Sequence, residues 1–205
     1  MKTLKRISLL SLIILALVSS CVVPSLHPLY TKNELIVDKR LEGVWEGIKE
    51  SDNNASLKIS KFDPNQSKGS LPDNADKLYR LEHTEDGETV IFNLFLVKVG
   101  NSTYLDFHPH EYADLEFKNF FGLMHLYPVH TFAKVSFEEN QLIIQLFDGD
   151  FIKKMIKQNR VKISNENVSG EIILTASPKE LQKFVLKYGN ESELYEDKSI
   201  LKRKG

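Results

Sequence analysis

Two strand-like runs joined by Asp86-Gly87 constrain the fold of this 205-residue chain more than any other feature. Residues 79–84 alternate apolar and polar side chains, and residues 89–99 are rich in β-branched and aromatic ones. An Asp-Gly pair accepts the positive φ angles of a two-residue turn, which joins antiparallel strands into a hairpin. The sequence therefore predicts an antiparallel sheet in this region.

More runs of the same kind follow along the chain. Gly100-Asn101 leads into a run over 102–108, in which Thr103, Leu105 and Phe107 share one face of a strand. The remaining expected strands lie over 131–137 and 141–147, around a turn at 138–140, and over 161–163 and 171–176, around a turn at 165–167. Short connections of this kind predict a meander of antiparallel strands with one half-buried face.

Two short helices are expected near the C-terminus of this mainly β chain. The first has Asp150 as its candidate N-cap, followed by an apolar stripe of Phe151, Ile152, Met155 and Ile156. The second begins with a capping box of Ser177 and Glu180 around Pro178, and Gly189 marks its end. Its apolar positions recur with a helical period: Leu181, Phe184, Val185 and Tyr188.

Residues 1–20 have the layout of a secretory signal peptide. Three basic residues precede an almost wholly apolar run over 7–18, and two small serines follow it. The alternative is a transmembrane anchor, but a helix needs about 20 apolar residues to cross the hydrocarbon core, and this run is shorter. We therefore expect a signal that is cleaved.

Cys21 is the only cysteine, so the chain cannot form an internal disulfide. With the preceding Val18-Ser19-Ser20, it resembles the lipobox of bacterial lipoproteins. The resemblance implies cleavage between Ser20 and Cys21, a diacylglyceryl group on the sulfur, and acylation of the new amino terminus by a chain such as palmitate. Two or three chains anchor firmly, because each buried methylene contributes about 0.8 kcal/mol. The alternative is an ordinary signal followed by an unmodified Cys21.

The mature chain is expected to have three parts. These are a lipidated tether over 21–40, a β domain over 41–189 and a polar C-terminal tail over 190–205. The tether contains Pro24 and Pro28 and is more apolar than a flexible linker needs, so part of it is expected to lie against the domain.

Charge and sorting signals bound the location and the partners. Without the three basic residues of the leader, 24 Lys and Arg stand against 28 Asp and Glu, a formal charge of −4. This balance argues against nucleic acid, whose binders are usually strongly basic. Residues 22–25 carry no acidic side chain, which favours an outer-membrane protein that faces the periplasm. The basic run 202–204 is interpreted as a solvated tail.

Gly43 and Trp45 form a Gly-x-Trp triplet before the first expected strand. With the antiparallel meander and the late helix, this triplet resembles the lipocalins, in which the tryptophan plugs the closed end of a barrel and the glycine allows close approach of the backbone. The resemblance implies a lipocalin-like barrel or a strongly curved sheet. Residues 41–189 also resemble uncharacterised lipoproteins of some Gram-negative bacteria. The alternative is that Trp45 is a core residue without a carrier role.

Noncatalytic binding of a small apolar ligand or lipid, without a cofactor, is the first hypothesis for function. A loop over 117–132 is too apolar to be freely solvated. It could be a flap over the barrel mouth, a patch near Phe120 that docks a partner or the bilayer, or ordinary core. A docking patch would favour the second hypothesis, an envelope protein–protein interaction module. The candidate ligand contacts are Trp45, Phe92, Phe95, Phe107, Phe121, Met124 and Tyr127, with Leu94 beside them.

The histidines suggest a third hypothesis, a metal-dependent enzyme. His108 and His110 flank Pro109 at the end of an expected strand, and His130 lies on the next connection. Three imidazoles can hold a zinc ion, whereas the alternative is ordinary surface or hydrogen-bonded histidines. The sequence contains no Gly-x-Ser-x-Gly, no His-Glu-x-x-His and no phosphate-binding glycine loop, so it indicates no catalytic residue.

Overall fold

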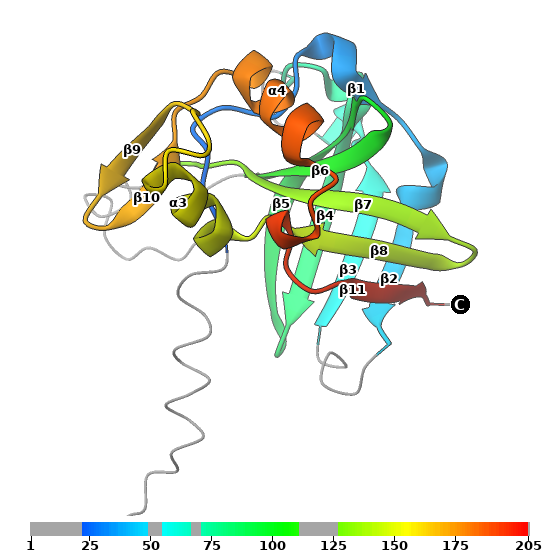
Figure 1. Ribbon diagram of the computed structural model, residues 1–205. Coiled ribbons are helices and arrows are strands. Elements are labelled where there is room, and N and C mark those ends of the chain that lie inside the picture. The colour runs from blue at the N-terminus through cyan, green and yellow to red at the C-terminus, as the bar shows by residue number, and fades with distance from the viewer. Residues whose placement is uncertain (1–21, 49–54, 67–70, 111–126, 205) are drawn as a thin grey trace, which may run out of the picture.

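The computed structural model describes residues 22–48, 55–66, 71–110 and 127–204. Their main element is a closed antiparallel barrel of eight strands, consistent with a lipocalin-like barrel (Figure 1). The predicted fold class is therefore confirmed. The barrel strands are β2 Gly43–Gly47, β3 Ala55–Lys61, β4 Leu78–Glu85, β5 Glu88–Val99, β6 Ser102–Pro109, β7 Thr131–Glu138, β8 Gln141–Leu146 and β11 Ser199–Arg203.

The other elements pack on the outside of the barrel or join its strands. Two α-helices and a small hairpin cover one side, and a two-residue strand pairs with β5. Their bounds are α3 Gly149–Lys157, α4 Pro178–Tyr188, β9 Asn165–Val168, β10 Glu171–Leu174 and β1 Leu35–Ile36. The 3-10 helices are η1 Lys32–Glu34, η2 Lys39–Leu41, η4 Pro64–Gln66, η5 Ala75–Lys77 and η7 Ser192–Leu194.

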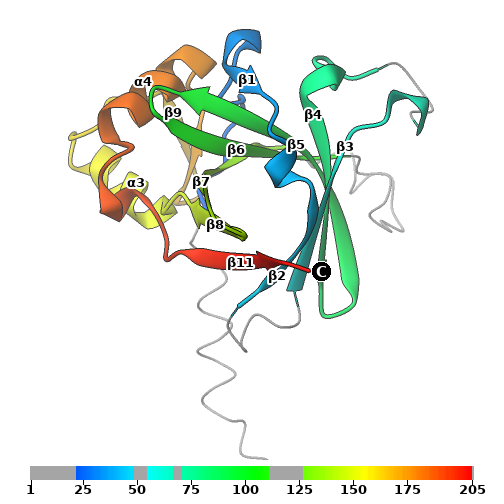
Figure 2. The same cartoon turned by 90° about the vertical axis from the view of Figure 1, so that its right-hand side faces the viewer.

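The C-terminal strand β11 closes the barrel. It lies between β2 and β8, with Leu201 opposite Gly47 on one side and Leu142 on the other (Figure 2). Strand β6, at the end of the strand order, also pairs with β5, and this pairing completes the ring of eight strands. The expected polar tail over 190–205 is therefore wrong, because η7 and β11 fold within it. A five-residue strand with only two apolar residues gives a weak sequence signal, and pairing with two neighbours holds it in place.

The hairpins test the expected turns directly. Asp86 and Gly87 have φ angles of 50° and 86°, so the predicted tight turn between β4 and β5 is confirmed. The strands around 138–140 are also confirmed, as β7 and β8. The expected turn at 165–167 is wrong, because those residues belong to β9 and the turn is Ser169-Gly170.

Both helices form where the sequence predicts them. The N-cap of α3 is Asp148, whose carboxylate accepts a hydrogen bond from Phe151 N at 2.8 Å, and not the expected Asp150. The capping box of Ser177 and Glu180 begins α4 as predicted. Gly189 ends α4 with an ordinary φ of −66°, but a Cβ there would overlap the Tyr104 hydroxyl, so only glycine fits.

Alternation along the strands divides the apolar residues into two clusters on opposite sides of the barrel wall. On β5, for example, Leu94 and Leu96 face inward, and Phe95 and Val97 face outward. The inner cluster consists of Leu41, Trp45, Ile59, Tyr79, Leu81, Leu94, Leu96, Leu105, Ala133, Val135, Leu142 and Ile144. The outer cluster joins the outward residues of the wall to α3, α4 and the β9–β10 hairpin, and includes Leu29, Phe132, Phe147, Leu181 and Phe184.

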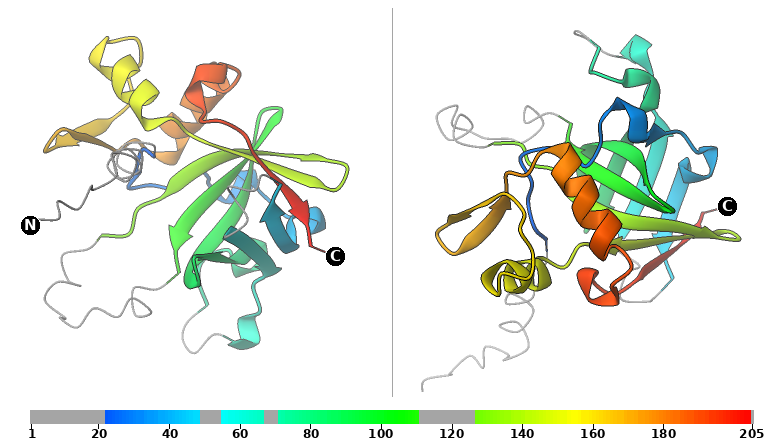
Figure 3. Two further views of the ribbon diagram at one scale, coloured as in Figure 1. Left: turned by 90° about the horizontal axis from the view of Figure 1, so that it is seen from below. Right: turned by 45° about the horizontal axis from the view of Figure 1, so that its top comes forward.

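The N-terminal segment 22–30 is part of the folded body. Figure 3 shows this segment, in blue, between the β9–β10 hairpin and the barrel. Ser25 pairs with His130 on one side and with Leu174 on the other, and Val23 and Leu29 are buried in the outer cluster. The expectation that part of the tether lies against the domain is confirmed. Its expected boundary at residue 40 is wrong, because residues 23–30 already pack within the folded body.

One end of the barrel is closed by η2 and by Arg203 of β11. The Trp45 indole donates to the Leu41 carbonyl at 2.9 Å, and the guanidinium of Arg203 lies 4.4 Å from the centroid of the Trp45 ring. Arg203 also donates to the carbonyls of Glu42 and Arg40, so it is not part of a solvated tail. Gly43 has a φ of 141°, a conformation that other residues rarely adopt, and a Cβ there would also overlap this guanidinium, which explains the glycine of the Gly-x-Trp triplet.

Candidate ligand-binding cavity

The inner cluster does not fill the barrel. A cavity of about 320 Å³ lies toward the end away from η2. It is bounded by the last residue of β2, the first of β3, the last of β4 and the first of β11, which all lie at this end of the barrel. The residues that line it are Trp45, Gly47, Ala55, Ser56, Leu57, His83, Glu85, Phe107, Ile144, Leu146, Ser199 and Leu201.

The walls of the cavity are apolar and come from four different strands. Leu57 on β3, Phe107 on β6 and Leu201 on β11 are half-buried, because one side of each faces the cavity and not other side chains. Ile144 and Leu146 of β8 complete the wall. The strand register brings these positions together, since antiparallel partners at the same level point to the same side of the sheet.

The rim of the cavity is polar. His83 and Glu85 project from the end of β4, and Ser199 lies at the start of β11. Trp45, which is 2% exposed, lies at the floor with its ring nitrogen already bonded within the chain. Such a site can enclose an apolar body and leave a polar group of the ligand at the rim, where it finds a carboxylate, an imidazole and a hydroxyl.

The structure brings together some of the predicted ligand contacts and separates others. Trp45 and Phe107 line the cavity. Phe92 packs against the inner cluster and contacts Phe107 edge to face, with ring centroids 6.4 Å apart, but it does not line the cavity. Leu94 is fully buried in the inner cluster.

Two other predicted contacts face elsewhere. Phe95 is wrong as a cavity residue: it faces outward, and its ring centroid lies 4.7 Å from that of Tyr30. Tyr127 is 70% exposed and does not line the cavity. Phe121, Met124 and the patch around Phe120 lie outside the described residues.

The sequence reasoning missed most of the cavity wall, including Leu57, Ile144, Leu146 and Leu201. Alternation could have identified the residues of β8, because its even-numbered apolar residues face inward, opposite odd-numbered partners on β7. It was weaker for Leu57, in a strand whose neighbours are Ser and Lys, and for Leu201, in the stretch interpreted as a tail. No motif marks these residues, since strand pairing alone assembles them.

The histidine candidates lie on the outer side of the barrel wall and do not converge on one point. The rings of His108 and His130 lie 4.4 Å apart, centroid to centroid, whereas His110 Nδ1 is 2.8 Å from the side-chain oxygen of Asn93. His130 Nδ1 is 2.6 Å from Asp106 Oδ1. Within the described residues, no group of three His, Cys, Asp or Glu side chains could hold a metal ion.

Asp106 is the fully buried centre of this polar group. Its second oxygen accepts a hydrogen bond from Leu29 N at 2.7 Å, so the carboxylate ties the N-terminal segment to β6. Burial raises the pKa of Asp106, although the bonds from His130 and Leu29 oppose that rise. Burial and the neighbouring His130 lower the pKa of His108 to about 4. These contacts give the group a structural role, namely to dock residues 22–30.

Comparison with protein-family models, with curated proteins and with solved structures finds no significant match. In the part of the chain that the structure describes, no helix is both long enough and apolar enough to cross a bilayer.

Proposed function

We propose that this protein is a lipid-anchored envelope lipoprotein whose barrel binds a small, mainly apolar ligand without converting it. The observation that carries the proposal is the cavity itself, with an apolar wall, a polar rim and a floor sealed by Trp45 and Arg203. Its volume of about 320 Å³ lies at the lower end of the range for ligand pockets, roughly 300–1,000 Å³, which favours a small ligand.

The leader supports the location in the cell. Cleavage before Cys21 and acylation of its sulfur would place the lipid two residues from Val23, which is buried in the outer cluster. Such a short connection would hold the barrel close to the bilayer, at the periplasmic face of the outer membrane. A ligand that partitions into membranes would then be concentrated near the cavity.

The only tryptophan of the chain makes the binding proposal directly testable. Trp45 lies at the cavity floor, so its fluorescence reports on occupancy without a label. The chain from Val22 onward, which retains the buried N-terminal segment, is titrated with alcohols and fatty acids of increasing length. We expect saturable changes in Trp45 emission and up to about fourfold tighter binding per added methylene until the cavity is full.

Two matched variants on β3 locate the binding. Ala55→Phe fills the mouth of the cavity and should abolish the fluorescence change, whereas Lys58→Phe adds the same group at an exposed position of the same strand and should leave it unchanged. The absence of saturation with every ligand, or equal loss in both variants, would contradict the binding proposal. The absence of saturation would also favour the alternative hypothesis, an interaction module that binds a protein partner.

The anchor is tested separately in cells. Cys21→Ala should release the domain from the membrane fraction or leave an uncut precursor. Normal processing together with unchanged partitioning into detergent would show that Cys21 carries no lipid.

A further inference from the structure

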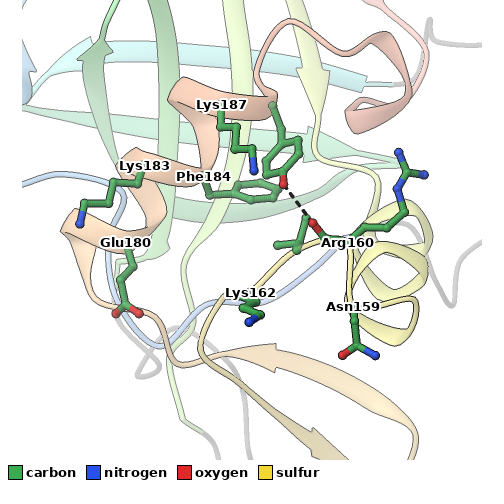
Figure 4. A pocket seen from close by; sticks show the side chains of 9 residues that line it. Asn159, Arg160, Lys162, Glu180, Lys183, Phe184 and Lys187 are labelled. Carbon is green, nitrogen blue, oxygen red and sulfur yellow. Dashed lines mark hydrogen bonds between the residues drawn. The ribbon is translucent and has the colours of Figure 1, made fainter.

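A second pocket lies outside the barrel, between the end of α3 and the exposed side of α4. Its volume is about 400 Å³, and it is separate from the cavity described above, with which it shares no residue. Figure 4 shows Lys187 beside Phe184, Lys162 below them, and the side chains of Lys183 and Arg160 extending outward on the two sides of the pocket. The residues that line the pocket are Asn159, Arg160, Val161, Lys162, Glu180, Lys183, Phe184, Lys187 and Tyr188.

The pocket combines four cations with a single carboxylate. Arg160 and Lys162 come from the turn after α3, and Lys183 and Lys187 come from α4. None of the four forms an ion pair with a carboxylate among the residues that the structure describes. The one carboxylate, Glu180, already accepts hydrogen bonds from Ser164 and Ser177, and these bonds lower its pKa.

The lysines of α4 repel one another. Lys183 and Lys187 are four residues apart, so they lie on the same face of the helix, where like charges destabilise it. The Glu180 carboxylate, one turn before Lys183, and the Tyr188 ring beside Lys187 offset part of this repulsion. An anion bound between them would reverse its sign and turn the pair into a favourable interaction.

The floor of the pocket is apolar and fixed. Val161 and Phe184 are buried, and the rings of Phe184 and Tyr188 are 5.3 Å apart. The Tyr188 hydroxyl donates to the Arg160 carbonyl at 3.1 Å, which joins α4 to the turn after α3 across the pocket. Lys187 Nζ lies 4.9 Å from the centroid of the Tyr188 ring. The site therefore offers an apolar floor bordered by positively charged side chains.

We propose that this pocket binds a phosphate group carried on a small organic body, with the oxygens between Lys183, Lys187 and the two cations of the turn. Ammonium and guanidinium groups are the preferred protein partners of phosphate. The body of the ligand would lie on Phe184 and Tyr188. A soluble phosphomonoester and the headgroup of an anionic phospholipid share this chemistry.

The experiment uses the chain from Val22 onward with two probes at low salt. Phenyl phosphate is titrated calorimetrically, and vesicles of phosphatidylglycerol in phosphatidylcholine are compared with vesicles of pure phosphatidylcholine in a sedimentation assay. Saturable binding of phenyl phosphate supports a soluble ligand. Binding to the anionic vesicles without saturable binding of phenyl phosphate supports a lipid headgroup.

Matched double variants assign the binding to this pocket. Replacing both Lys183 and Lys187 by Gln should weaken binding about 25-fold, since each cation contributes roughly fivefold near a phosphate surface. Replacing both by Arg should preserve it. Changing Lys179 and Lys198 to Gln removes the same charge from exposed positions outside the pocket and should have little effect.

Two results would overturn the proposal: no binding of either probe, or equal weakening by the pocket variant and the control variant. Ala55→Phe, which fills the barrel cavity, should leave phosphate binding intact. This variant therefore tests the phosphate site separately from the cavity.

Discussion

The two apolar clusters of this protein share one barrel wall but differ in how completely they are packed. The outer cluster is covered by α3, α4, the β9–β10 hairpin and residues 22–30, and it borders the second pocket only at Val161 and Phe184. It includes a chain of edge-to-face rings from Phe132 through Phe147 to Tyr195. The inner cluster is tightly packed only toward Trp45 and ends at an apolar cavity.

The difference separates structural packing from a candidate site. Most side chains of the outer cluster, such as Leu29 and Phe147, are almost completely buried, so they contribute to stability by close packing. Those at the cavity wall, such as Leu57 and Leu146, keep one free side and contribute less to stability than their size allows. An apolar surface that the chain leaves open in this way is what a ligand can cover.

The sharpest test of this difference is the same mutation on each side of the wall. Leu29→Ala removes a fully buried side chain from the outer cluster and should lower the free energy of unfolding by about 3 kcal/mol. Leu146→Ala, at the cavity wall, should lower it by only about 1 kcal/mol, because no new void forms around the missing atoms. Urea denaturation measures both values, and equal losses would show that the cavity wall is packed like the outer cluster.

The polar centre of the outer cluster makes its stability depend on pH. Because the pKa of His108 falls from 6.5 to about 4 on folding, the unfolded chain binds more protons between these values, and stability is lost as the pH decreases through that window. The full shift corresponds to about 3 kcal/mol, which partial exposure reduces to roughly 1–2 kcal/mol. Urea denaturation at pH 7 and near pH 4 measures the loss.

His108→Gln is the control for this prediction and should remove most of the loss. The raised pKa of Asp106 acts in the opposite direction. The folded chain keeps the proton of this carboxyl to a higher pH than the unfolded chain does, so its contribution to stability is lost as the pH rises above 3.8, the pKa in the unfolded chain. The variant should therefore show a flat or reversed trend. The same decrease as in the natural chain would assign the pH dependence to other groups.

The smallest expected effect concerns the closed end of the barrel. Arg203→Met removes the contact with Trp45 and two hydrogen bonds to carbonyls, and should cost about 1 kcal/mol, since the side chain remains partly exposed. Lys202→Met, on the same strand, should have almost no effect. Thermal unfolding followed by Trp45 fluorescence distinguishes the two variants. Equal melting temperatures would show that Arg203 does not stabilise the closed end of the barrel.

Local signals in the sequence were sufficient to predict most strands of the barrel wall. Asp86-Gly87 and the alternation after it predict β4 to β8, and the capping box at Ser177 predicts α4. Strand β11 could not be predicted, because its pairing with β2 depends on residues more than 150 positions away. The docking of residues 22–30 depends in the same way on distant partners, above all on Asp106.

The candidate site follows the same division. Trp45 was predicted from the Gly-x-Trp triplet, and Phe107 from its position on one face of an expected strand. Phe95 was predicted wrongly, because the side of the barrel wall that it faces is set by strand register. Leu201 lies in the unpredicted strand, so nothing local could assign it to the cavity.

Native mass spectrometry of the chain from Val22 onward, exported to the periplasm and purified gently, tests the central claim most directly. We expect a reproducible added mass that is released on denaturation, is lost in Ala55→Phe and is kept in Lys58→Phe. A bare polypeptide mass, or an added mass that Ala55→Phe leaves unchanged, would contradict a ligand inside the barrel.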